Sequence, residues 1–110
     1  MGSLYDADGQ PARALPFYDK AVELQPGFAL GWFARGKAQV ELHHAEQAIA
    51  DYGAYMKLVP NDPEAFNNRG DAFLSLGRVE EAIADFNQAL MLSPSYPEAM
   101  VNRGLANFRR

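Results

Sequence analysis

The 110-residue sequence contains no cysteine, which excludes disulfide bonds, thiolate zinc sites and cysteine nucleophiles. It also lacks an apolar run close to the roughly 18 residues that a membrane-spanning helix needs. The N-terminal residues have neither the basic and apolar regions of a secretory signal nor the Ser or Thr that myristoylation requires, because Asp6 stands at that position. We therefore expect no membrane association and a cytoplasmic location.

Positive charge is scarce as well. Ten Lys and Arg residues face fourteen Asp and Glu residues, giving a net charge of −4, and the longest basic run is Arg109-Arg110. This balance argues against nucleic acid as a partner, since phosphate backbones attract clustered cations. A hydrophobic content of 48% with 22% charged residues indicates a single small folded domain.

Residues for catalysis are also few. The sequence has two histidines, and it contains no nucleophile elbow, phosphate-binding loop, dinucleotide fingerprint or zinc-protease motif. The segment His43-His44-Ala45-Glu46 is the one cluster with the right residue types for a metal. His43 and Glu46 are three residues apart, but they flank an expected turn, and no third ligand converges with them. We expect no metal, no cofactor and no enzymatic activity.

What the sequence does contain is a repeat with a period of 34 residues. Several kinds of residue recur at this step: proline at 26, 60 and 94; glycine at 2, 36, 70 and 104; alanine at 14, 48 and 82; and an aromatic at Tyr18, Tyr52 and Phe86. Further apolar series keep the same register, among them Trp32, Phe66 and Met100. So many coincident series make the period a property of the whole chain.

Each repeat reads as two helices. In the clearest copy, Asp62-Pro63-Glu64 supplies a capping side chain, a proline at the first turn and an acid near the positive helix end. Gly77 is placed to stop this first helix in a left-handed conformation, and a second helix is predicted from about Val79 to Leu92. Gly70 is predicted to allow close approach of the two helices, with Phe86 covering the gap.

The sequence resembles the tetratricopeptide repeat family in its period and in these glycine, alanine, aromatic and proline positions. Two complete copies occupy residues 29–62 and 63–96, a partial first repeat covers 1–28, and 97–110 holds the first helix of a further repeat, all within one domain of residues 1–110. The resemblance implies an all-α, right-handed superhelical solenoid of antiparallel helix hairpins, whose first helices line a concave groove. Such proteins are typically adaptors that hold a peptide or a helix of a partner.

The copies also depart from the pattern. Tyr55 stands where the other copies have alanine, Gln39 stands at an aromatic position and His43 replaces a loop glycine. We interpret the first two as volume compensation inside one hairpin, with a role of Tyr55 in a binding surface as the alternative. Pro16 lies about five residues into an expected helix, where it predicts a kink or an irregular first turn and a weak first hairpin.

Binding is expected on the first helices, on the sides that face away from the second helices. The contact residues that we predict there are Phe33, Lys37, Asn67, Asn68, Asp71 and Asn102. Asn68 and Asn102 are equivalent positions, and an amide can pair with either group of a peptide backbone. This resembles the asparagine ladder of some family members, with Ala34 breaking it in the second copy.

The predicted groove does not resemble the family's other binding mode, the clamp for acidic peptide tails. Glu64 and Asp71 stand where that mode requires cations, and Lys37 is the one basic residue that fits. Arg69 and Arg103 precede the repeat glycines and are interpreted as structural, with their stems over apolar surface.

The leading functional hypothesis is therefore a non-catalytic interaction module or scaffold that binds a protein or peptide partner in its groove. A docking or regulatory segment of a larger enzyme, such as a glycosyltransferase, is one alternative. A self-assembling scaffold is the other, because the terminal segment 97–110 exposes apolar residues that a second copy could cover.

Overall fold

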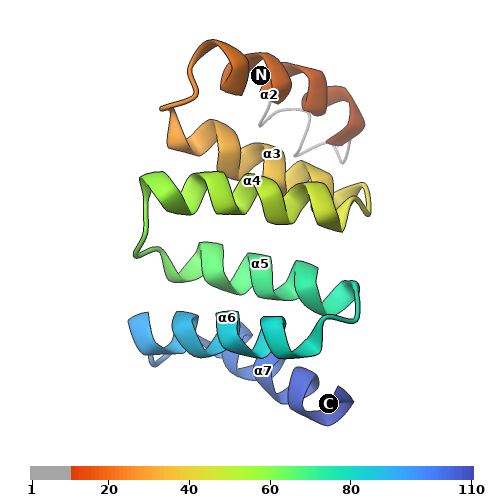
Figure 1. The fold of residues 1–110 in the computed structure, drawn as a ribbon, viewed down its shortest axis with the longest axis vertical. Coiled ribbons are helices and arrows are strands. Elements are labelled where there is room, and N and C mark those ends of the chain that lie inside the picture. The colour runs from red at the N-terminus through yellow and green to blue at the C-terminus, as the bar shows by residue number, and fades with distance from the viewer. Residues whose placement is uncertain (1–10) are drawn as a thin grey trace.

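The computed structural model describes residues 11–110, and the regular secondary structure within this range is all α-helix, joined by short turns. The described helices are α2 (Pro11–Leu24), α3 (Ala29–Glu41), α4 (Ala45–Leu58), α5 (Pro63–Ser75), α6 (Val79–Leu92) and α7 (Pro97–Arg109). They stack one after another along the 38 Å long axis, with tight turns joining antiparallel neighbours (Figure 1). The expected solenoid of helical hairpins is confirmed; Gly2 and the rest of the first ten residues lie outside the described range.

Helix boundaries follow the local chemistry that the sequence predicts. Asp62 caps α5, because its Oδ1 accepts a hydrogen bond from the Glu64 backbone N–H at 3.0 Å. Gly77 follows the same helix with φ of +77°, the left-handed conformation expected of it. His43 takes φ of +64° at the equivalent turn after α3, so the repeat geometry is kept there by a residue for which it is less favourable.

In each complete hairpin, one glycine allows the two helices to pack closely. A Cβ atom on Gly36 would lie 2.8 Å from the Tyr52 ring, and one on Gly70 would lie 2.7 Å from the Phe86 ring. Tyr52 and Phe86 are the largest fully buried side chains of the described residues. The recurring glycine and aromatic pair therefore sets the spacing of α3 against α4 and of α5 against α6.

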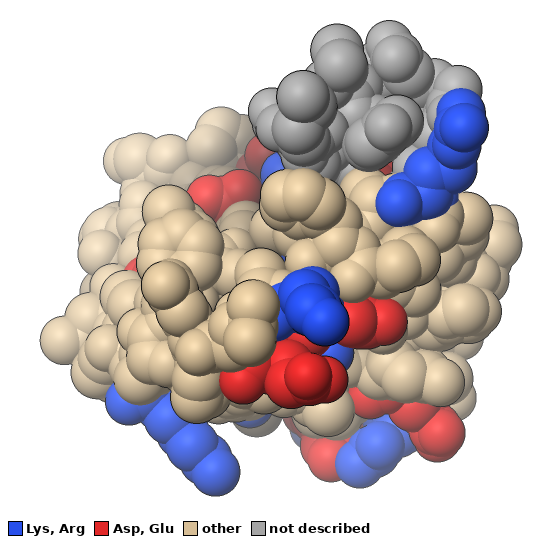
Figure 2. Space-filling view, turned by 90° about the horizontal axis from the view of Figure 1, so that it is seen from above, with Lys and Arg blue, Asp and Glu red and all other residues tan. Residues whose placement is uncertain are grey.

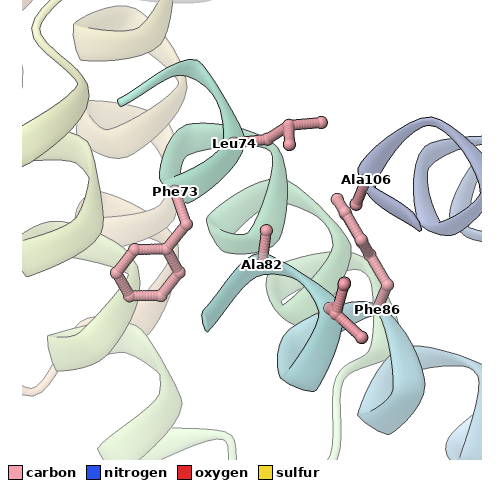
Figure 3. Close-up of a cluster of buried hydrophobic side chains, with 6 residues drawn as sticks. Phe73, Leu74, Ala82, Phe86 and Ala106 are labelled. Carbon is pink, nitrogen blue, oxygen red and sulfur yellow. The ribbon is translucent and has the colours of Figure 1, made fainter. Parts of the chain in front are cut away.

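Among the described residues, the largest apolar cluster lies where the α5–α6 hairpin meets α7. Phe73 and Leu74 of α5 pack there with Ala82, Ile83 and Phe86 of α6, and Ala106 faces them from α7 (Figure 3). Neighbouring repeats thus share one core, as expected when each hairpin buries its apolar face against the next.

Arginines connect the same pairs of helices through charge. The Arg35 guanidinium donates hydrogen bonds to Asp51 at 2.7–3.1 Å, and Arg69 donates to Asp85 at 2.8 and 2.9 Å, in both cases sixteen residues further on. Arg69 also lies over the rings of Phe66 and Phe73, as its structural interpretation predicts. At the end of the helix stack where α2 lies, positively and negatively charged side chains are neighbours on the surface (Figure 2).

Helix α2 continues through Pro16, so the proline does not break it. Pro16 is exposed, whereas Ala14, Tyr18 and Val22 form a buried stripe on the other side. The packing of that stripe holds the helix together across the missing backbone hydrogen bond.

The second copy is repacked around Tyr55. Its ring contacts Phe33 with centroids 4.9 Å apart, its hydroxyl donates a hydrogen bond to Asp62, and it is 6% exposed. Gln39 is buried too, with its Oε1 2.9 Å from Nδ1 of His44. Tyr55 is therefore part of the interior, and its burial removes it from the candidates for a binding surface.

Candidate functional site

A hollow lies between α3 and α5. One cavity of about 200 Å³ is lined by Lys37, Val40, Glu41, Tyr52, Asn68 and Asp71. A second cavity of about 360 Å³ shares Val40 and Asp71 with it and continues toward the turn after α3, along His43, Ala45, Ala72, Ser75 and Leu76. Tyr52 and Ala45 belong to α4, and His43 and Leu76 lie in turns. The other lining residues belong to the first helices α3 and α5, which is where the sequence predicts the groove.

The structure brings Lys37, Asn68 and Asp71 together in this hollow. Phe33 lies beside them and is partly buried, because its ring packs against both Tyr52 and Tyr55. The Lys37 ammonium nitrogen is 6.0 Å from the centre of the Phe33 ring. Phe33 therefore packs behind the residues that line the hollow, and part of its side chain stays accessible to solvent.

Asn67 does not reach the groove, contrary to the prediction. It is 3% exposed, and its Oδ1 accepts a hydrogen bond from Nδ2 of Asn102 at 3.0 Å. The reason is rotation: consecutive residues on a helix point about 100° apart, and α5 turns Asn67 toward α7 while Asn68 faces the hollow. Asn67 holds Asn102 in place rather than presenting itself to a ligand.

The two predicted ladder asparagines thus have different surroundings. Asn68 lines the same cavity as the buried Tyr52, and Asn102 is held by its hydrogen bond to Asn67. Both are partly exposed, so each amide keeps hydrogen-bonding capacity for another group.

Apolar surface lies along the same first helices. Leu30 of α3 is 63% exposed, and Val101 and Leu105 of α7 are 62% and 52% exposed. A ligand lying across the three helices would meet these side chains as well as the amides.

Negative charge dominates the electrostatics of the hollow. Burial raises the pKa of Asp71 above its usual value, and the nearby charge of Glu98 raises it further. Burial also raises the pKa of Tyr96, with the charges of Glu64 and Glu98 adding to the effect. Lys37 is the basic side chain that lines the same cavity as Asp71 and Glu41. Because the negative side chains outnumber it, the hollow favours the approach of a cation or a hydrogen-bond donor.

Two structural networks were not predicted in detail from the sequence. The ion pairs Arg35–Asp51 and Arg69–Asp85 are related by the repeat period. Both the arginine and the aspartate recur at this step, and this pattern in the sequence could have revealed them. The hydrogen bond from Tyr55 to Asp62 carried no such signal, because it occurs in one copy.

Within residues 11–110, no group of three or more metal-ligating side chains converges, and the His43-His44 turn is no exception. In the same range, no helix combines the length and the apolar character that crossing a bilayer takes.

Stacked antiparallel hairpins with a hollow on their first helices define an α-helical repeat protein. Residues 70–110 match the family described as TPR repeat, and residues 1–28 match the tetratricopeptide repeat. The chain belongs to the tetratricopeptide repeat family.

Solved structures of this family superpose closely on the chain. The second TPR domain of human RPAP3, in complex with the HSP70 peptide SGPTIEEVD, has a TM-score of 0.92 at 26% identity over 96% of this chain and 88% of its own. The Arabidopsis OM64 TPR domain has a TM-score of 0.93 at 31% identity, over 99% of this chain and 90% of its own.

A curated relative is also similar in sequence. The UDP-N-acetylglucosamine–peptide N-acetylglucosaminyltransferase of Giardia intestinalis is 38% identical over 66 residues, which is 60% of this chain. The chain spans 4% of the length of that relative.

Proposed function

We propose that the chain is a non-catalytic module, formed by residues 1–110 as one domain, that binds an extended peptide segment in the hollow across α3, α5 and α7. The observation that carries the proposal is the grouping of Lys37, Asn68 and Asp71 in one cavity, with Asn102 on the next first helix. The peptide-bound human neighbour supports peptide binding as the general mode.

The chemistry of the hollow favours a peptide with basic rather than acidic side chains. The peptide held by the human neighbour carries three carboxylate side chains in its EEVD end. Here Glu41, Asp71 and Glu98 lie on the first helices, and Lys37 is the cation that lines the cavity. An acidic tail would meet like charge, whereas Lys or Arg side chains would pair with these groups.

The asparagines contribute a second element of recognition. Asn68 and Asn102 occupy equivalent positions on adjacent repeats, and Asn102 is oriented by its hydrogen bond to Asn67. Because Asn102 is held in place, it loses little side-chain entropy when it pairs with a peptide backbone. We therefore propose Lys37, Asn68, Asp71 and Asn102 as contact residues, with Phe33 at the wall and Asn67 as a support.

The proposal is tested by fluorescence anisotropy with three labelled decapeptides: lysine-rich, uncharged, and acidic with the sequence SGPTIEEVD at its end. We expect the lysine-rich peptide to bind most tightly and to weaken as salt is added. Asp71→Asn combined with Glu98→Gln is expected to reduce its affinity about tenfold. Glu23→Gln combined with Glu46→Gln, which changes the net charge equally on α2 and α4, is expected to leave it unchanged. Tightest binding of the acidic peptide would contradict the proposal.

The Giardia relative favours a second candidate, a docking segment of a larger glycosyltransferase-like enzyme. In that role the asparagines would hold the backbone of many substrates regardless of side-chain charge. This alternative predicts equal affinity for the lysine-rich and uncharged peptides, and a loss for both on Asn68→Ala. A loss confined to the lysine-rich peptide in the carboxylate variants would favour the first candidate instead.

A further inference from the structure

The turn after α3 contains the one residue other than glycine that is left-handed among residues 11–110. His43 takes φ of +64° at the place where the next hairpin has Gly77 at +77°. A residue with a Cβ is less stable than glycine in this conformation, because the Cβ crowds the neighbouring carbonyl oxygen. The exposed His43 side chain forms no hydrogen bond or ion pair with any described residue. The histidine therefore costs stability, and no polar contact offsets that cost.

The His43 side chain does contribute to the hollow. It lines the larger cavity, of about 360 Å³, at the end next to the turn. A glycine at this position, as in the following repeat, would leave that end without a side-chain wall. Backbone strain without a structural benefit is typical of functional sites, and here the strained residue faces a cavity of the size that ligands occupy.

A second departure from the repeat gives this cavity its room. Ala45, also in the lining, stands 34 residues before Val79, which packs against the main apolar cluster of the next hairpin. Valine carries two more methyl groups than alanine, so the start of α4 leaves space beside α5 that the start of α6 does not leave. The cavity is thus shaped by two residues in which this copy differs from the next.

The rest of the lining is mostly apolar. Val40, Ala72 and Leu76 contribute carbon surface. The Ser75 hydroxyl donates a hydrogen bond to the backbone carbonyl of Ala72 at 2.8 Å, so its proton is not offered to a ligand. Asp71 forms no hydrogen bond or ion pair with the described residues, and it is shared with the smaller cavity. The larger cavity therefore suits an apolar group, with a carboxylate at the boundary between the two cavities.

We propose that the larger cavity is a specificity pocket for an aromatic side chain of the bound peptide, with the His43 imidazole as one wall. This inference rests on the proposed function, the binding of a basic peptide in the hollow. An aromatic ring fills the carbon-lined space, and it can pack against the imidazole ring in a stacked or edge-to-face arrangement.

The neighbouring cavity specifies what lies beside that ring. Because both cavities share Val40 and Asp71, two side chains on the same side of an extended peptide can enter them together. Such side chains are two residues apart in the sequence. Asp71 and Glu41 favour a cation in the smaller cavity. The partner is therefore a segment with an aromatic residue two positions from a lysine or an arginine.

The experiment uses the intact chain and two labelled, end-blocked peptides, Gly-Ser-Lys-Ser-Phe-Ser-Lys-Ser-Gly and the same sequence with alanine in place of phenylalanine. Fluorescence anisotropy is expected to show about tenfold tighter binding of the phenylalanine peptide to the wild-type chain. His43→Gly is expected to remove most of this gain and to leave the affinity for the alanine peptide unchanged. The same variant is expected to raise the melting temperature by about 4 °C, because glycine accepts the left-handed conformation more readily.

Ala45→Val fills the cavity with the side chain that the next repeat has at this position. It is expected to weaken binding of the phenylalanine peptide about threefold and to leave the alanine peptide unaffected. Ala50→Val is the matched control, because Ala50 is an exposed residue of the same helix that does not line the cavity. It is expected to change neither affinity.

Equal affinity of the wild-type chain for the two peptides would overturn the aromatic pocket and leave the proposed function standing. A loss in His43→Gly that is the same for both peptides would also overturn it, because the histidine would then act without contacting the aromatic ring. Failure of both peptides to bind would contradict the pocket and the proposed function together.

Discussion

At the scale of single residues, the absence of a side chain does as much as its presence. Gly36 and Gly70 lie in helix interiors, where glycine costs about 1 kcal/mol relative to alanine. The rings of Tyr52 and Phe86 lie so close to them that a methyl group would not fit without movement. The cost of glycine is thus offset by the packing of the two largest buried side chains.

This predicts opposite signs for one substitution at equivalent positions. Gly70→Ala is expected to lower the free energy of unfolding by about 1–3 kcal/mol, because the new Cβ would overlap the Phe86 ring. Gly104→Ala is expected to raise it by up to about 1 kcal/mol, since nothing lies within 4 Å of the added atom. Urea unfolding of both variants checks the prediction. A Gly70→Ala variant that is as stable as wild type, or more stable, would contradict the packing role of Gly70.

Tyr55 predicts a dependence of stability on alkaline pH. Burial, together with the hydrogen bond to Asp62, raises the pKa of Tyr55 to about 12. The unfolded chain ionises this group near pH 10, so between pH 10 and 12 the folded state holds a proton that the unfolded state has lost. The stability contributed by this group is therefore complete below pH 10 and is lost as the pH rises toward 12.

Tyr55→Phe isolates this contribution. At pH 8 the variant is expected to be less stable than wild type by about 1 kcal/mol, because Asp62 loses a donor. As the pH rises past 10 the difference is expected to shrink, since wild type is destabilised by ionisation and the variant has no hydroxyl at that position. Urea unfolding at several pH values measures it. A constant difference from pH 8 to 11.5 would show that the Tyr55 hydroxyl is not protected.

At the scale of helices, the period and the end signals were sufficient to predict where elements lie. Pro63, Gly77 and the stripe from Val79 to Leu92 mark boundaries that the structure reproduces. These signals are local, depending on capping groups and allowed backbone angles, and are therefore visible in the sequence.

Helix α2 is an exception to these local signals, because it continues through a proline. Pro16 removes the hydrogen bond that its backbone would donate to Ala12, and tertiary packing holds the helix regardless. Pro16→Ala is expected to raise the free energy of unfolding by about 1–3 kcal/mol. Pro63→Ala is the matched control, since proline suits the first position of a helix, and it is expected to change stability by less than about 0.5 kcal/mol. A loss of stability in Pro16→Ala would contradict this account of α2.

At the scale of the whole molecule, the groove was harder to predict than the helices. The repeat places Lys37, Asn68 and Asp71 on one side, and the structure brings them into one cavity. The prediction of Asn67 as a groove residue is wrong, because a shift of one position along the helix turns a side chain from the groove to the interior. That rotation depends on how α5 packs against α7, and contacts between repeats are not encoded in the pattern of a single helix.

The most direct test of the central claim is an NMR titration of the isotope-labelled chain with the lysine-rich peptide, following each backbone amide. Binding in the hollow predicts that the largest shift changes occur at Lys37, Asn68, Asp71 and Asn102, with Lys57 of α4 and Met91 of α6 unaffected. Shift changes centred on the outer sides of α4 and α6 while the amides of the hollow stay fixed would contradict the account.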